Sequence, residues 1–176
     1  MSAMNDHLLS ATGSFGLETA YSMLKKASRE YRRCTTSETE DDMRDAAINC
    51  AITLWHMNDW VWNGIANSSK NKPEMKSLLG VTGRRIAKDD LVKWAVASCP
   101  ELNVCQSICN GSKHVVCTGI TEARMIADEG CESDDDAKVL SRLEIVDTEG
   151  VRDAKKVLFT ALCFWHHHAT NESVLR

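Results

Sequence analysis

The sequence AAINCAITLW, residues 46–55, is the most informative part of the chain about its fold. Its residues are apolar on almost every side of a helix, and a helix of that kind is buried inside a protein. The predicted helix begins within the acidic segment TTSETEDD, residues 35–42, and continues to about Ala66. Ser37 and Glu40 have the spacing of a capping box, and the acidic residues suit the first turn of a helix. We therefore predict that this helix is the central, buried helix of the fold.

Further helices are predicted on both sides of it. Within Leu17–Arg33, apolar residues recur every three or four positions, which indicates an amphipathic helix. A helix is expected at about Asp89–Ser98, with Asp89 as its N-cap, and another at about residues 101–113, started by the preceding proline. Two more are predicted at about residues 74–79 and at about Arg152–Ala169.

A small β element is predicted before the last helix. The sequence becomes β-like from His114 to Ile120, and VLSRLEIV, residues 139–146, alternates in polarity as a strand does. Asp147–Gly150 is expected to form a turn. The fold class is therefore mainly α, a helical bundle of about five or six helices with a small β element inserted before the last one. The 176 residues suit a single domain, residues 17–176, after a flexible N-terminal arm, residues 1–16.

Charge and hydropathy exclude several classes of protein. The net charge is -4 and the pI about 5.9, so the chain as a whole is not attracted to nucleic acid or to an anionic membrane. The net charge therefore gives no support for RNA as a partner. No apolar run reaches the roughly 18–20 residues that cross a bilayer, and the N-terminal sequence does not resemble a secretory signal. We expect a cytoplasmic protein with no membrane partner.

The eight cysteines are expected to be reduced. Cys50, Cys105, Cys109 and Cys163 lie among apolar residues at helical spacing, where a free thiol behaves as a small apolar group. Cys99, Cys105, Cys109 and Cys117 do not have the spacing with which four ligands surround zinc. The sequence therefore predicts no metal and no cofactor.

Polar residues form a narrow stripe on the central helix. At 100° per residue, one line along this helix contains Asn49, Thr53, His56, Asp59 and Asn63. The neighbours of this stripe are mostly apolar, and polar groups in such a place cost stability unless each finds a partner. The stripe therefore indicates a buried polar network, a ligand cleft or a subunit interface.

The helix at residues 101–113 carries a second polar stripe. It consists of Gln106, Asn110, Lys113 and His114. If the two stripes face each other, a pocket between them contains the candidate catalytic residues His56, Asp59, Asn110, Lys113 and His114. In such a pocket one imidazole acts as a general base, a carboxylate orients the other imidazole, and the lysine stabilises a developing anion.

Structural roles explain the same residues. A polar stripe on the helix at 101–113 is also typical of a face exposed to water. His56 and Asp59 are three residues apart on one helix and also suit a hydrogen-bonded pair that holds the bundle in register. The tryptophans of the central helix suit core or interface positions better than base stacking.

Two short motifs suggest a family resemblance. The pairing of WHMNDW, residues 55–60, with CNGSKH, residues 109–114, resembles small uncharacterised bacterial and phage proteins. More loosely, the pairing is similar to HEPN-type helical domains. That resemblance implies a four- or five-helix bundle, commonly dimeric, in toxin–antitoxin or anti-phage systems. Active members of the superfamily are metal-independent ribonucleases that use an Arg followed four to six residues later by a His.

The motif of those ribonucleases is incomplete in this chain. His114 occupies the position of the motif His, and Asn110 that of the polar residue, often Asn, that tends to follow the Arg in the motif. The positions expected for the Arg hold Ser107, Ile108 and Cys109, and Lys113 is the nearest cation. The resemblance therefore implies a HEPN-like fold without its complete catalytic motif.

Three functions are compatible with these observations. The first is a HEPN-like accessory or interaction protein without catalysis, as a homodimer or with a protein partner. The second is a metal-independent ribonuclease or another nucleotide-acting enzyme that uses His114 with Lys113, Asn110 and His56. The third is a small-ligand binder in the core of the bundle, between the two stripes. Phosphate-binding loops, dinucleotide-binding loops, zinc-protease motifs and nucleophile elbows are absent from the sequence.

Overall fold

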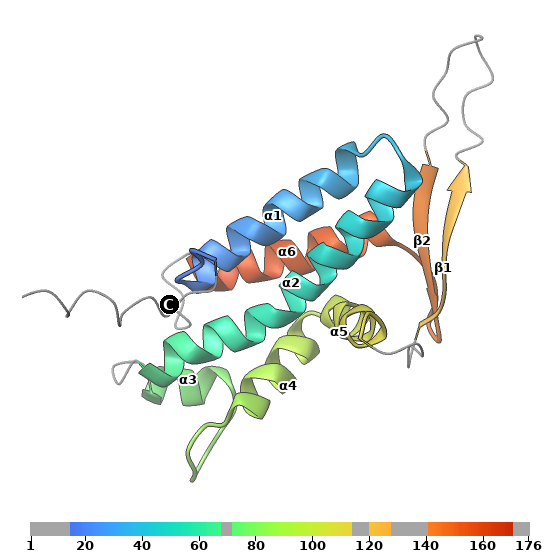
Figure 1. Ribbon diagram of the computed structural model, residues 1–176. Helices are drawn as coiled ribbons and strands as arrows, with labels where there is room; N and C mark the ends of the chain where they lie inside the picture. The colour runs from blue at the N-terminus through green and yellow to red at the C-terminus, as the bar shows by residue number, and fades with distance from the viewer. Residues whose placement is uncertain (1–14, 68–71, 114–119, 128–140, 171–176) are drawn as a thin grey trace, which may run out of the picture.

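The computed structural model describes residues 15–67, 72–113, 120–127 and 141–170. Within these ranges the chain forms a helical bundle with a small antiparallel sheet inserted before the last helix, as the sequence predicts (Figure 1). The elements follow one another as α1 (Ala20–Thr36), α2 (Glu40–Asn67), α3 (Lys72–Leu78), α4 (Lys88–Ser98), α5 (Glu101–Gly111), β1 (Ile120–Ala127), β2 (Ser141–Asp147), β3 (Gly150–Asp153) and α6 (Ala154–Thr170). None of the described helices is both long and apolar enough to cross a membrane.

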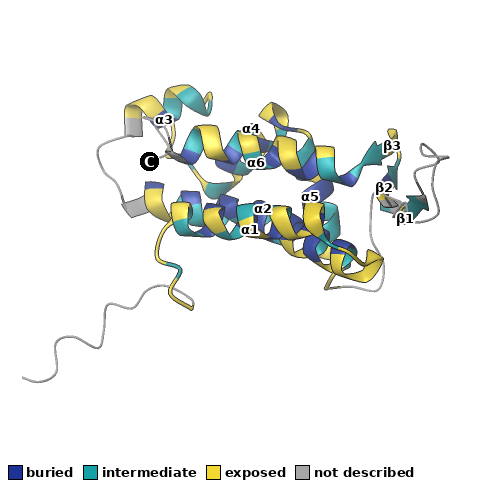
Figure 2. Ribbon diagram, turned by 90° about the horizontal axis from the view of Figure 1, so that it is seen from above, coloured by how far each residue is buried: buried dark blue, intermediate teal, exposed yellow. Residues whose placement is uncertain are grey.

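Helix α2 is the centre of the bundle, which confirms the prediction from residues 46–55. It packs against α1, α4, α5 and α6 (Figure 1). Cys50, Ala51, Leu54 and Met57 of α2 are completely buried. Buried residues line the inner sides of the helices and exposed residues the outer sides (Figure 2). The apolar stretch therefore forms the core because other helices cover it on several sides.

Two predicted helix caps are wrong. Ser37 does not cap α2, because its hydroxyl donates backwards to the Arg33 carbonyl at 2.5 Å. The cap is Thr39, whose Oγ1 accepts the Asp42 N–H at 3.1 Å. Asp89 does not cap α4 either, since Ala87 is the N-cap residue of this helix. The side chain that caps this end of α4 is that of Asp90, the residue after Asp89. Its Oδ2 accepts the Ala87 N–H at 2.8 Å.

The sheet contains more strand than the sequence predicts. Strand β2 pairs antiparallel with both β1 and β3, and Leu143 and Ile145 of β2 are buried as expected. Strand β1 only begins at Ile120, where the β-like sequence was expected to end. The predicted turn is present and leads into β3. Arg152, the predicted first residue of the last helix, lies in this strand instead. That helix, α6, therefore begins at Ala154, where Asp153 Oδ1 accepts the Lys155 N–H at 2.8 Å.

The last helix is attached to the centre of the bundle by one polar contact as well as by packing. Ala154, Val157, Leu158, Ala161 and Trp165 form its buried face. The Nε1 of the fully buried Trp165 donates to the Leu54 carbonyl of α2 at 3.0 Å. This bond satisfies the indole N–H, which a buried tryptophan needs.

The described cysteines are all free thiols. Cys34, Cys50, Cys99, Cys105 and Cys109 are buried, as small apolar groups would be. Cys163 differs from the expectation, because it lies on the exposed side of α6. Cys117 and most of the predicted arm, residues 1–14, lie outside the described residues.

Candidate functional site

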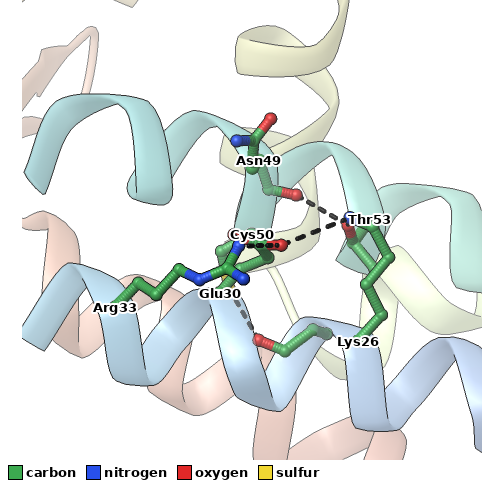
Figure 3. Close-up of polar contacts among 7 residues, drawn as sticks. Lys26, Glu30, Arg33, Asn49, Cys50 and Thr53 are labelled. Atoms are coloured by element: carbon green, nitrogen blue, oxygen red, sulfur yellow. Dashed lines mark hydrogen bonds and ion pairs between the residues drawn. The ribbon is translucent and has the colours of Figure 1, made fainter. Parts of the chain in front are cut away.

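The polar stripe of α2 is used for contacts to neighbouring helices, beginning with α1. Lys26 Nζ of α1 donates to Thr53 Oγ1 at 2.6 Å, and Thr53 Oγ1 donates to the Asn49 carbonyl at 2.7 Å (Figure 3). Thr53 is almost completely buried, with 1% of its surface exposed. Both hydrogen-bonding capacities of its hydroxyl are therefore satisfied inside the bundle.

A buried carboxylate on α1 extends this network. Glu30 is buried, and both of its carboxylate oxygens accept from Arg33 Nη1 at 3.0 Å. Its Oε1 also lies 3.9 Å from Lys26 Nζ (Figure 3). Two cations on the same helix thus compensate the buried charge, which would otherwise be costly. Nearby, Cys50 Sγ donates weakly to the Ala27 carbonyl at 3.6 Å.

Asp59 connects α2 to α4. Its Oδ1 forms an ion pair with Nζ of Lys88, the first residue of α4. The two side chains are 48% and 43% exposed, so water screens the attraction between them. The ion pair therefore fixes the position of the start of α4 more than it stabilises the fold.

His56 connects α2 to α5. Its Nε2 lies 3.7 Å from Sγ of Cys109, a buried residue in the last turn of α5. Burial lowers the pKa of His56 below its ordinary value of 6.5, and the positive charges of Lys113, Lys88 and Lys26 lower it further, while Asp59 opposes them. The imidazole is therefore neutral at pH 7.

This thiol and imidazole do not form an activated nucleophile. Cys109 is only 1% exposed, which leaves no access for a substrate to its thiol. The pair is suited to joining two helices.

The structure brings only part of the predicted constellation together. Asn110 and Lys113 of the second stripe are exposed, and Lys113 lies near enough to affect the pKa of His56. His114 lies outside the described residues. Asn49 and Asn63 of the first stripe are exposed. His56 and Asp59 do lie on one side of α2, but their partners belong to different helices.

The partner residues were missed in the sequence for a clear reason. In the sequence, Lys26 and Lys88 look like ordinary surface cations, and Cys109 looks like an apolar core residue. Only Glu30 left a signal, because it occupies an apolar position of α1, three residues after Ala27 and four before Cys34. A charged residue at such a position needs a polar partner.

A cavity lies elsewhere in the molecule. Its volume is about 460 Å³, and it is formed where the start of α5, strands β2 and β3 and the first turns of α6 meet. Its lining includes Arg142, Glu144 and Lys156 and none of the residues of the two stripes. Among the described residues no three His, Cys, Asp or Glu side chains converge as metal ligands would.

The described residues of the predicted site thus serve mainly in contacts between helices, and the charged cavity is a separate feature of the molecule. No model of a known protein family, no curated protein and no solved structure matches the chain.

Proposed function

We propose that this chain is a HEPN-like helical accessory protein, which acts by binding a second copy of itself or another protein and performs no catalysis. One observation carries the proposal. Three polar residues of the α2 stripe each contact a different helix: Thr53 contacts α1, Asp59 contacts α4 and His56 contacts α5. Side chains that are used for contacts between helices are less available to act on a substrate.

The positions of the missing motif Arg support the same proposal. Of the three positions at which the ribonuclease motif would place it, Cys109 is buried against His56 and Ile108 is packed against the core. A guanidinium at either position would have to leave the interior or lose its hydration. The local packing thus favours a fold that does without the Arg.

Protein binding is supported by an exposed aromatic side chain that lies against a half-buried one. Phe159 of α6 is 52% exposed, and its ring lies 5.6 Å from the ring of Tyr31 of α1. Protein interfaces are enriched in aromatic side chains of this kind. We propose that this α1–α6 face contributes to the homodimer.

The homodimer is tested by light scattering coupled to size exclusion over a wide concentration range. The expected result is a dimer that weakens in Phe159→Asp and is unchanged in Tyr21→Asp, the matched control on an exposed aromatic of α1. A chain that is monomeric at every concentration, or a dimer that is indifferent to Phe159→Asp, overturns the homodimer at this face.

The ribonuclease alternative has one observation in its favour, the closeness of the Lys113 charge to His56. Its test is incubation of the purified chain with single-stranded RNA. We expect intact RNA. Cleavage that disappears in His114→Ala but persists in His167→Ala, an exposed histidine of α6, would replace the accessory function with the nuclease.

A further inference from the structure

The cavity beside the sheet has the size and polarity of a small-molecule site. Its volume of about 460 Å³ is within the range of roughly 300–1,000 Å³ that is usual for ligand pockets. Arg142 of β2 and Lys156 of α6 both line it. A third lining cation, Arg152 of β3, is already paired with Asp147 and Glu149. The cavity is thus reached by cations from three elements.

The acidic residues of the cavity are already engaged by the protein. Glu144, which is buried, accepts from Arg142 Nη2 at 2.6 Å and from Arg124 Nε at 3.2 Å. Asp153 Oδ1 accepts the first N–H groups of α6. Glu101 Oε2 accepts weakly from the Cys99 thiol at 3.4 Å. Each carboxylate thus has a protein partner, and Asp153 already occupies the N-terminus of α6.

The cations and a hydroxyl keep unused donors. Arg142 uses Nη2 for Glu144 and is 48% exposed, and no other partner of its N–H groups is found in the part of the chain that the structure describes. Within the described residues, neither the ammonium of Lys156 nor the hydroxyl of Thr160 has a partner. Lys156 and Thr160 are four residues apart on α6, so they lie one above the other on the same side of the helix.

The lining of the cavity also includes apolar side chains. Val151 of β3 and Val157 of α6 both line it, and Val151 is 54% exposed. Such a lining favours a ligand that has a short apolar body beside its charged group.

We propose that this cavity binds a small organic anion, with the carboxylate or phosphate group of the ligand between Arg142, Lys156 and Thr160 and its apolar part against the two valines. Glu144 is a positioning residue, because it holds the Arg142 guanidinium at the cavity while leaving part of its donors free. This inference is independent of the proposed accessory function, since the cavity shares no residue with the α2 stripe.

The experiment is a titration of the full chain followed by ¹H–¹⁵N NMR, with phenyl phosphate, benzoate and neutral benzyl alcohol as probes. We expect one or both anions to shift the amide signals of Val151, Lys156 and Val157, and benzyl alcohol to leave them unchanged. The stronger of the two anions identifies phosphate or carboxylate as the preferred group.

Two variants and a control make the test specific. Lys156→Gln is expected to weaken the binding of the anion about tenfold, since it removes a charged hydrogen bond. Thr160→Val is expected to weaken it less. Both residues are exposed, so these variants should fold normally. Lys155→Gln, at the adjacent position and outside the lining, should bind as the native chain does. Absence of shifts with both anions, equal shifts with benzyl alcohol, or equal loss in Lys155→Gln overturns the proposal.

Discussion

His56 Nε2 and Cys109 Sγ lie 3.7 Å apart, and this contact joins the central helix α2 to the last turn of α5. The imidazole is partly removed from water at the contact, which is why its pKa is lowered. The contact is therefore sensitive to pH, because a protonated imidazole would place a positive charge at a buried thiol.

The stability of the fold is expected to decline on acidification because of His56. The unfolded chain binds the proton more readily than the folded chain, so the contribution is complete above the ordinary pKa of 6.5 and is lost as the pH falls below it. Urea unfolding at a series of pH values measures this slope. His56→Leu should flatten it in part, because the pKa of His168 is also lowered, chiefly by burial. A slope as steep in His56→Leu as in the native chain would contradict the assignment.

Thr53→Val should destabilise the bundle by about 1 kcal/mol, because it removes the hydroxyl that Lys26 and the Asn49 carbonyl share while it keeps the shape of the side chain. Denaturant unfolding gives this difference. Thr35→Val is the matched control, since Thr35 is exposed on α1 and its change should stay within about 0.5 kcal/mol. If both variants lose the same stability, the bond from α1 to α2 contributes nothing specific.

Asp90 should stay ionised at a lower pH than an ordinary aspartate. The hydrogen bonds from Arg84 and from the Ala87 N–H lower the pKa of Asp90 to about 2. Its stabilising contribution is therefore present above the ordinary pKa of 3.8 and is lost as the pH falls from there towards 2. NMR titration of the carboxyl carbon measures the pKa directly, and Arg84→Gln should raise it. A normal pKa for Asp90 in the native chain would show that the ion pair does not form in solution.

The contribution of the Arg84–Asp90 ion pair to stability can be tested with the neighbouring carboxylate as a control. Asp90→Asn should remove part of the acid-induced loss of stability below pH 4 or so. Asp89→Asn changes the adjacent, exposed carboxylate and should leave that loss as it is in the native chain.

Asn58→Leu should leave the stability unchanged or raise it by about 1 kcal/mol, because it replaces a buried polar group of similar size with an apolar one. Asn58 Nδ2 donates to the Trp55 carbonyl at 2.9 Å, but its Oδ1 is buried and has no partner among the described residues. Thermal unfolding is the measurement, with Asn63→Leu on the exposed side of α2 as the control. A clear loss of stability in Asn58→Leu alone would show that the oxygen is hydrogen-bonded in solution.

The helices could be predicted from the sequence because helical periodicity is a local property. The 100° step along α2 places Thr53, His56 and Asp59 on one side, and the structure confirms that side as a line of contacts between helices. Their partners were not predictable, since they are 27, 53 and 29 residues away along the chain, respectively. Periodicity in one segment carries no information about which helix will lie against it.

The strands show a second limit. Strand β3 has four residues, Gly150–Asp153, which is too short for an alternating pattern. It exists because Gly150, with φ of 128°, reverses the chain so that Val151 pairs with Val146. The cavity beside the sheet depends on this reversal and was therefore not predictable either.

The buried thiols allow local unfolding of the bundle to be measured without introducing a label site. Cys34, Cys50, Cys99, Cys105 and Cys109 are distributed over α1, α2, the end of α4 and α5, and burial raises the pKa of Cys50 and Cys99 to about 12. Alkylating reagents react with the thiolate, so each cysteine is labelled only while its own part of the chain is transiently unfolded. Labelling rates followed by mass spectrometry would thus rank the helices by the order in which they separate from the centre of the bundle.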